Sequence, residues 1–254
     1  GRVKISYTMD GRPVEPSEVV VPGSYTATAS IGGATVSVSF DLVPATLTVA
    51  NGKDVSWQVP VWGVSLDRYV KSQFVIPASM LKKMENSNVS HMRFYVARRD
   101  DDSYPWSDAV FRVCLKEVDS DTISSFYDLS DSTVVYEGPL TPGKEYLDVP
   151  FAEYGYHYDG KNLLVSIHNV QTGIACNVEF YGVNREGASV GNRASTPDAI
   201  SATQRNFLPK VTFTFVPDTK ESQDGGAAGE PEDYQEPQKT NDNAGSSNAT
   251  AVND

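Results

Sequence analysis

Apolar and polar residues alternate along most of the chain, and this pattern constrains the fold more than any other feature. Alternation with a period of two places one face of a strand in a core and the other toward water or a second surface. The clearest examples are Met92, Phe94 and Val96 in segment 90–97 and Phe111, Val113 and Leu115 in segment 109–118. We therefore predict an all-β protein built from short antiparallel strands.

The central region, residues 46–216, contains about ten strand candidates separated by Gly, Pro, Asn and Asp. Only segment 78–85 looks helical. Many strands at short spacing indicate an antiparallel β-sandwich. The predicted strands lie near 46–50, 55–62, 71–77, 90–98, 109–118, 132–137, 145–149, 162–168, 176–182 and 210–216.

Residues 1–45 predict a separate, smaller β module with one apolar face. Turn signals stand at Asp10-Gly11, Pro22-Gly23 and Gly32-Gly33, between alternating segments. The arrangement Pro-Gly-x-Tyr-x-Ala-x-Ala from Pro22, followed by a Val-x-Phe strand, resembles the second half of bacterial immunoglobulin-like repeats. The resemblance implies a partial or reduced immunoglobulin-like module.

The last segment, 217–254, loses all periodicity and is rich in Gly, Ser, Asn, Gln, Glu and Pro. It carries nine acidic and two basic residues, more than half of the net charge of −12. Such a composition buries too little apolar surface to offset its ordering entropy, so we expect a disordered acidic tail or linker.

Charge and hydropathy exclude some classes of partner. A net charge of −12 argues against nucleic acid, because a phosphate backbone needs a basic face. No apolar run reaches the roughly 18 residues of a membrane span. We expect a monomer.

The ionisable residues show no pattern typical of a catalytic or metal site. His91, His157 and His168 lack metal-ligand spacing, and no nucleophile elbow or phosphate loop is present. Cys114 and Cys176 are too few for a disulfide scaffold, so two buried thiols or a single disulfide both remain open. We expect no enzyme activity and no cofactor. The acidic loops could bind a structural calcium ion through their carboxylates, and the alternative is that they are simply exposed to solvent.

Aromatic residues near turns give the best indication of a binding site. Asp101, Asp102, Tyr104 and Trp106 lie in one long connection, and Trp62 is a further turn aromatic. Loops on a rigid sandwich often carry binding function, and an exposed Trp or Tyr beside acids can stack on a sugar ring. These five residues are our candidate ligand-binding set. The two tryptophans can equally cap the edge of the core.

Several segments between residues 50 and 215 together resemble a known kind of module. It is a jelly-roll-like β-sandwich of large secreted and surface proteins of gut anaerobic bacteria, similar to adhesin-type domains. The resemblance rests on Val59-Pro-Val-Trp-Gly63, Gln73-Phe-x-x-Pro-Ala-Ser-Met-Leu81, Met92-x-Phe-Tyr95, Trp106-x-x-Ala109, Phe111-x-Val-x-Leu-Lys-Glu-Val118, Thr133-Val-Val-Tyr-x-Gly138, Asn162-Leu-Leu164, Phe180-Tyr-Gly-x-x-x-x-Gly-Ala-Ser189 and Phe207-Leu-Pro-Lys-x-Thr-Phe213.

This resemblance implies a secreted or cell-surface location, on the outer face of a Gram-negative bacterium. It implies adhesion or binding without catalysis, with a glycan or a host or bacterial surface protein as ligand. Two alternatives stay open: a carbohydrate-binding module appended to a hydrolase, and a structural spacer in a multidomain surface protein. An exposed pair of aromatics on one face would favour the carbohydrate-binding module.

Overall fold

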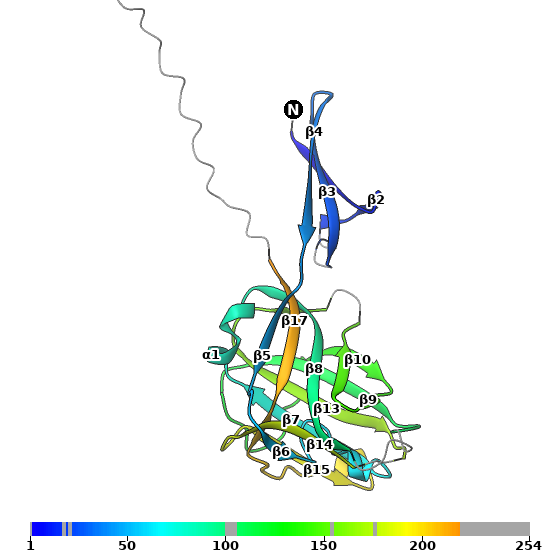
Figure 1. The fold of residues 1–254 in the computed structure, drawn as a ribbon, viewed down its shortest axis with the longest axis vertical. Helices are drawn as coiled ribbons and strands as arrows, with labels where there is room; N and C mark the ends of the chain where they lie inside the picture. Colours follow the sequence, from blue (N-terminus) through cyan, green and yellow to red (C-terminus); the bar gives the residue numbers. More distant parts are fainter. Residues whose placement is uncertain are drawn as a thin grey trace, which may run out of the picture. The chain divides into compact units, whose positions relative to one another are not determined.

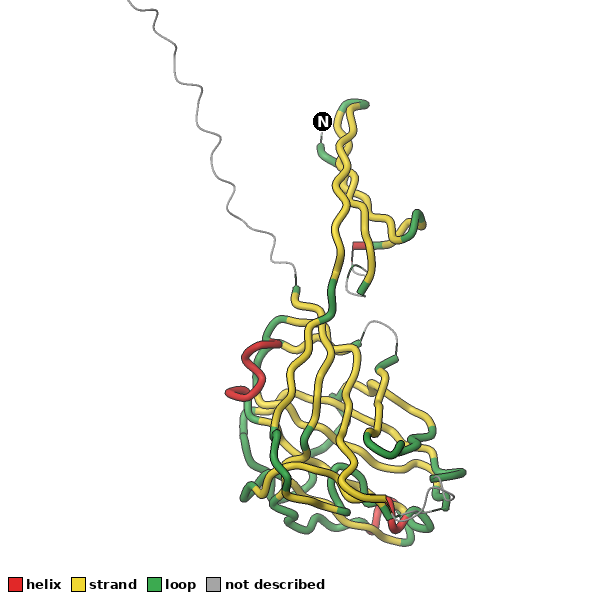
Figure 2. Tube along the Cα trace, viewed as in Figure 1, coloured by secondary structure: helices red, strands yellow, loops and turns green. Residues whose placement is uncertain are grey.

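The computed structural model describes residues 2–16, 19, 22–99, 106–152, 155–174 and 177–218. Strands and loops make up nearly all of this part (Figure 2), which confirms the predicted all-β class. Helical structure is limited to α1 (Ala78–Leu81) and the short 3-10 turns η2 (Gly63–Ser65), η3 (Lys82–Met84) and η4 (Pro197–Ala199). The helix predicted at 78–85 corresponds to α1 and η3.

The N-terminal module is a four-stranded antiparallel sheet in the order β2-β1-β3-β4. Among the described residues it has this one sheet, rather than the two layers of a complete sandwich domain. Two rows of Ser and Thr on its polar face are joined by hydrogen bonds such as Thr26 to Ser39 (3.1 Å). The strands are β1 (Lys4–Met9), β2 (Arg12–Val14), β3 (Gly23–Ile31) and β4 (Ala34–Leu42).

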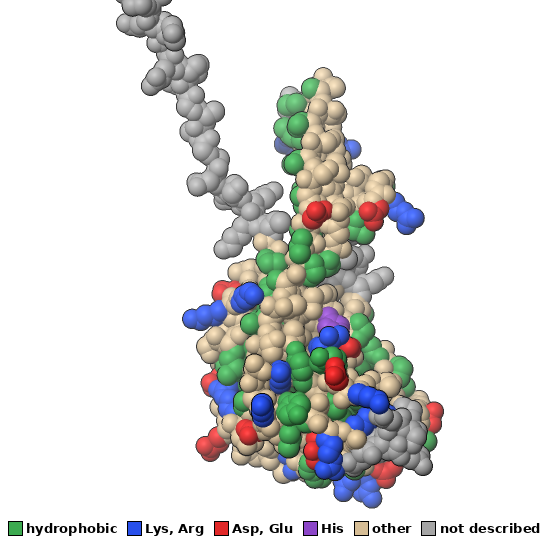
Figure 3. Space-filling view, viewed as in Figure 1, with side chains coloured by type: hydrophobic (Ala, Val, Ile, Leu, Met, Phe, Trp, Pro, Cys, Tyr) green, Lys and Arg blue, Asp and Glu red, His purple; other side chains and the backbone are tan. Residues whose placement is uncertain are grey.

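The opposite, apolar face of this sheet is covered at one end only. Tyr25 is 1% exposed and stacks on Phe40 with ring centroids 5.6 Å apart. Farther along the same face, Val36 and Val38 are 70% and 62% exposed. Hydrophobic side chains therefore gather on one side of this sheet in Figure 3, consistent with a module that lacks a second layer over part of its surface.

The larger module is a β-sandwich of two antiparallel sheets (Figure 1). One sheet has the order β10-β9-β13-β7-β15. The other has the order β16-β14-β8-β17-β5, with β11 and β12 paired to β8 and β6 paired to β14. The strands are β5 (Ala45–Val49), β6 (Asp54–Ser56), β7 (Tyr69–Ile76), β8 (Ser87–Arg99), β9 (Val110–Val118), β10 (Thr133–Gly138), β11 (Tyr146–Pro150), β12 (Tyr156–Tyr158), β13 (Asn162–Gln171), β14 (Val178–Asn184), β15 (Ser189–Ala194), β16 (Phe207–Pro209) and β17 (Val211–Pro217).

The hydrophobic core lies between these two sheets. Phe74 of β7 and Phe94 of β8 are fully buried and meet edge to face, with centroids 6.1 Å apart. The alternating residues named in the sequence analysis all point into this core: Met92, Phe94, Val96, Phe111, Val113 and Leu115. The predicted sandwich is therefore confirmed, and the alternation arises because one face of each of these strands is buried in the core.

Two short strands of the larger module, β15 and β16, were not predicted from the sequence. Strand β6 overlaps the longer segment predicted at 55–62 only at Val55 and Ser56. Strand β15 forms one edge of the five-stranded sheet and contains one large apolar residue, Val190, so it carries little periodic signal. The acidic tail from residue 219 onward lies outside the described residues, so its disorder stays a prediction.

The outer face of the five-stranded sheet carries a row of polar side chains. Cross-strand pairing places Lys71, His168 and Arg112 side by side, because directly opposite residues share a face. Arg112 also forms an ion pair with Glu137 at 2.7 Å. The Nδ1 atom of His168 is buried and has no hydrogen-bond partner. Burial, together with the positive charges of Lys71 and Arg112, lowers the pKa of His168 to about 4.

This lowered pKa predicts a loss of stability in mild acid. Below pH 6.5 the unfolded chain protonates His168 while the folded protein does not, so the free energy of unfolding falls as the pH drops from 6.5 to 4. The contribution of this residue is about 3 kcal/mol over that window. Denaturant unfolding at pH 7 and pH 4 measures it, and His168→Gln should lose less stability between the two pH values than the unaltered protein. An equal loss in both proteins would contradict the assignment.

Candidate functional site

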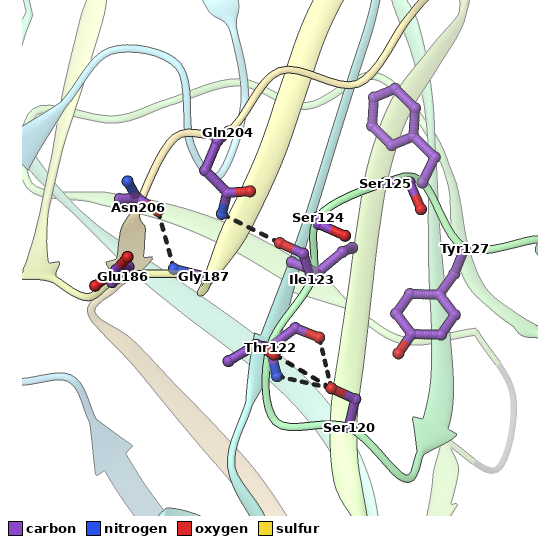
Figure 4. A pocket seen from close by; sticks show the side chains of 11 residues that line it. Ser120, Thr122, Ile123, Ser124, Ser125, Tyr127, Glu186, Gly187, Gln204 and Asn206 are labelled. Atoms are coloured by element: carbon purple, nitrogen blue, oxygen red, sulfur yellow. Dashed lines mark hydrogen bonds between the residues drawn. The ribbon is translucent and has the colours of Figure 1, made fainter.

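A cleft of about 790 Å³ opens at one end of the five-stranded sheet (Figure 4). One wall is the connection between β9 and β10, and the other is formed by the β14–β15 turn and the segment before β16. Hydroxyl and amide groups predominate in its lining. The lining residues are Ser120, Thr122, Ile123, Ser124, Ser125, Phe126, Tyr127, Glu186, Gly187, Gln204 and Asn206.

The first wall is fixed to the sheet by apolar side chains, of which Ile123 is the most buried, and Phe126, Tyr127 and Leu129 pack against the same cluster. Ile123 is 4% exposed and packs in a small cluster with Val75, Leu164 and Val190 on the outer face of the sheet. Its backbone nitrogen donates a hydrogen bond to the Gly187 carbonyl at 2.7 Å. The loop therefore has a small core of its own, separate from the main core between the sheets.

A buried amide holds the far end of the same wall. Gln73 on β7 is a polar residue, yet it is as fully buried as the apolar residues Phe74 and Val75 that follow it. Its Oε1 accepts a hydrogen bond from the Tyr127 nitrogen at 2.7 Å, and its Nε2 donates to the Tyr127 carbonyl at 3.2 Å. The side chain thus pairs with the loop backbone as a neighbouring strand would, and satisfies two polar groups next to a buried surface.

The second wall is joined to the first by hydrogen bonds between side chains and backbone. The Gln204 amide nitrogen donates to the carbonyls of Ile123 (3.1 Å) and Ser189 (3.2 Å). The Gly187 nitrogen donates to Asn206 Oδ1 at 2.9 Å (Figure 4). The contact of Gln204 with Ile123 joins the two walls across 81 positions of the sequence, and the other two contacts join the two segments of the second wall to each other.

Gly187 stands where the two walls come closest. Its φ of +69° lies in the left-handed region, and a Cβ atom there would lie 3.0 Å from the Thr122 side chain. Nearby, Arg185 and Asp121 form an ion pair across the walls at 2.8 Å. Both the backbone conformation and the narrow space favour glycine at this position.

Several polar groups of the lining remain available to a ligand. In the part of the chain that the structure describes, the hydroxyls of Ser124 and Ser125 and the Glu186 carboxylate have no hydrogen bond or ion pair. The rings of Phe126 and Tyr127 are half-buried in the same wall. Hydroxyl, amide and carboxylate groups beside aromatic surface can bind the hydroxyl groups and the apolar faces of a sugar.

Of the ligand-binding residues predicted from the sequence, Trp62 and Trp106 are described by the structure, and neither lines this cleft. Asp101, Asp102 and Tyr104 lie outside the described residues. Trp62 and Trp106 are 7% and 3% exposed, so neither ring is an open platform for stacking. Their burial favours the alternative of a core edge, and the ligand-binding role expected for the set stays a prediction.

Trp106 is packed tightly among aromatic residues at the end of the core. Its ring lies 5.7 Å from Phe111 and 6.5 Å from Phe180, centroid to centroid. A Cβ atom on Gly63 would overlap the Trp106 ring, so glycine at this position permits the close approach. The Trp-Gly pair at residues 62–63 therefore has a packing role.

The remaining candidates for chemistry show ordinary environments. Cys114 is a buried free cysteine, and burial raises the pKa of its thiol, which opposes the thiolate that a nucleophile requires. His91 and His157 lie beside carboxylates, at 3.0 Å from Asp148 and 3.1 Å from Asp159. Within the described ranges, no group of three or more His, Cys, Asp or Glu side chains is placed to hold a metal ion. Cys176 lies outside those ranges.

Comparisons with known proteins do not assign this chain to a family. No protein-family model matches the chain, and neither the curated proteins nor the solved structures contain a match. In the described part, no helix has the length and apolar character needed to cross a membrane.

Sequence reasoning missed the cleft for a clear reason. Most of its lining consists of polar residues in loops, which have no periodicity and no recognisable spacing. The one available signal was Gln73, a polar residue directly before the apolar run Phe74-Val-Ile76 of the same strand. A buried amide in such a strand indicates that some backbone outside the sheet needs hydrogen-bond partners.

The burial of Trp106 predicts a structural effect of its removal. Trp106→Ala should lower the free energy of unfolding by about 3–5 kcal/mol, because it leaves a large cavity between Phe111 and Phe180. Val134→Ala is a matched control, since Val134 is 47% exposed on β10 and should change stability by about 0.5 kcal/mol or less. Denaturant unfolding measures both variants. Equal stability of the Trp106 variant and the unaltered protein would show that the ring is not part of the core.

Proposed function

We propose that this chain is a non-catalytic binding module of a secreted or surface protein, and that the cleft beside Ile123 binds a neutral glycan. The observation that carries the proposal is the chemistry of the lining. Hydroxyl and amide groups from both walls face a space of about 790 Å³, with two aromatic side chains in one wall.

The neutral character of most of these groups favours a sugar over a charged ligand. Sugar hydroxyls are both donors and acceptors, and Ser, Gln and Asn side chains match them in both roles. Glu186 adds one acceptor carboxylate, which can accept two hydroxyl hydrogens. The half-buried ring of Phe126 is held by Lys71, whose Nζ lies 4.8 Å from the ring centroid.

The rigidity of the walls also supports binding at this place. Ile123, the Gln73 clamp and the Arg185–Asp121 ion pair fix the loop before a ligand arrives. A site that is formed in advance loses less conformational entropy on binding. The secreted or surface location belongs to the same proposal and rests on the resemblance to adhesin-type modules.

A bulky substitution inside the cleft tests the proposal. Ser124→Trp places a large side chain in the lining without removing a hydrogen bond, so it should weaken binding to a neutral polysaccharide by tenfold or more. The probes are soluble neutral polysaccharides, namely mannan, xylan and a β-glucan, compared by affinity electrophoresis and then by calorimetry for any that binds.

The matched control is Ser195→Trp. Ser195 is also an exposed serine in a loop, but it does not line the cleft. It should bind as the unaltered protein does, with the same melting temperature as the Ser124 variant. If no neutral polysaccharide binds, or if both variants lose binding equally, the cleft is not a neutral-glycan site.

A further inference from the structure

Two arginines and two tryptophans form a second cluster beside the cleft segment. Gln204 and Asn206 line the cleft, whereas the side chain of Arg205 between them lies over the Trp62 ring, with Cζ 4.8 Å from the ring centroid. Arg193 of β15 lies over the same ring at 5.3 Å. Two cations from different segments therefore meet on one buried indole.

An exposed indole completes this cluster. Trp57, which follows β6, meets Trp62 edge to face with centroids 5.5 Å apart and an interplanar angle of 78°. Trp57 is 43% exposed, in contrast to the buried Trp62. The cluster therefore presents a flat apolar surface close to two positive charges.

Hydrogen bonds hold each guanidinium in place. Arg205 Nε donates to the Gly191 carbonyl at 2.9 Å, and Arg193 Nη1 donates to the hydroxyl of the buried Ser65. Each arginine uses one of its nitrogens in these bonds, so the remaining donors of both forks can bind another group. Because the side chains are already ordered, a ligand would lose little rotamer entropy by binding them.

Neither arginine has a negative partner in the described part of the chain. Both are missing from the ion pairs that the structure forms there, although acidic residues outnumber basic ones in the sequence. Burial lowers the pKa of Arg205, as expected for a charge that lacks compensation. The Trp62 Nε1 atom in the same cluster is also buried without an acceptor. Contact with the Trp62 ring offsets part of the desolvation cost of the buried guanidinium, but it does not neutralise the positive charge.

We propose that Arg193 and Arg205 bind the oxyanion of an acidic saccharide, with its sugar ring on Trp57. Guanidinium forks match the planar geometry of a carboxylate and the oxygens of a sulfate. The exposed indole supplies the stacking surface that a pyranose ring requires. This site is separate from the neutral-glycan cleft, and it stands whether or not that cleft binds sugar.

The surroundings favour a saccharide over a nucleic acid. A phosphate backbone requires a continuous basic face, which two arginines beside one indole do not supply. On the face of the sandwich seen in Figure 3, basic and acidic side chains are interspersed without a continuous basic patch. A pair of arginines beside one indole fits a single anionic group attached to a ring.

The test uses two acidic polysaccharides that differ in their oxyanion. Polygalacturonate carries carboxylates and dextran sulfate carries sulfates, with unmodified dextran as the uncharged reference. Calorimetry at a fixed, near-physiological salt concentration should show binding of at least one acidic polymer and none of dextran. The polymer that binds identifies the carboxylate or the sulfate as the recognised group.

Single substitutions then locate the binding. Arg193→Gln, Arg205→Gln and Trp57→Ala should each weaken the affinity by tenfold or more. Lys82→Gln removes an equal charge from an exposed position on η3 and should leave the affinity within twofold. Trp57→Ala keeps the test valid if an arginine variant fails to fold, because Trp57 is exposed.

The outcomes separate this proposal from the function proposed for the cleft. Ser124→Trp should retain binding of the acidic polymer, and the arginine variants should retain binding of any neutral polysaccharide. Absence of binding to both acidic polymers would overturn the proposal. An equal loss in the Lys82 variant would also overturn it, because such a loss would indicate attraction by general charge.

Discussion

The larger sheet of the sandwich depends on the pairing of strand β8. This strand has 13 residues, and it pairs with β17, β11, β12 and β14. Its Phe94 meets Phe74 of the other sheet in the core. A shift of one residue in its register would turn Met92 and Phe94 outward and bring Arg93 into the core. The alternation in this one strand therefore specifies the register of four others.

Outside the core, the cleft depends on a few specific polar contacts. A net gain of about 1 kcal/mol is usual for one hydrogen bond, so no single contact holds the loop. The loop is held by the combination of the Ile123 cluster, the Gln73 amide and the Gln204 amide. Removal of the Gln73 side chain would leave two backbone groups of Tyr127 without partners beside a buried surface. The stability of the cleft is therefore linked to a residue that no ligand touches.

The parts of the fold that could be predicted from the sequence are the strands with a regular alternation of apolar and polar residues. Long strands with large alternating residues, such as β8 and β9, were placed to within about three residues, because burial of one face requires a period of two. Strands β15 and β16 are short or mostly polar, and their pairing depends on neighbours far away in the sequence. A single sequence gives no local signal for such pairing.

Burial of the tryptophans could not be predicted for a related physical reason. Trp62 and Trp106 both stand in turns, and the sequence does not show whether a turn folds over the end of the core. The decisive contact is the close approach of Trp106 to Gly63, which are 43 positions apart. The cleft has the same origin, because Ile123 and Gln204, which join its two walls, are 81 positions apart in the sequence. Long-range contacts thus determine the site, and local patterns determine the scaffold.

The segment 204–206 connects the two proposed sites in a way that has consequences for selectivity. Gln204 and Asn206, which has a left-handed φ of +50°, line the cleft, while Arg205 between them lies over the Trp62 ring. The cleft thereby receives neutral amides and the cluster receives a cation. Under the two proposals, ligands would be selected by charge on one side and by hydroxyl pattern on the other. Because both sides share one backbone segment, a shift of that backbone on binding at one site would alter the other, and the hydrogen bonds of Gln204 and Arg205 to the neighbouring backbone oppose such a shift.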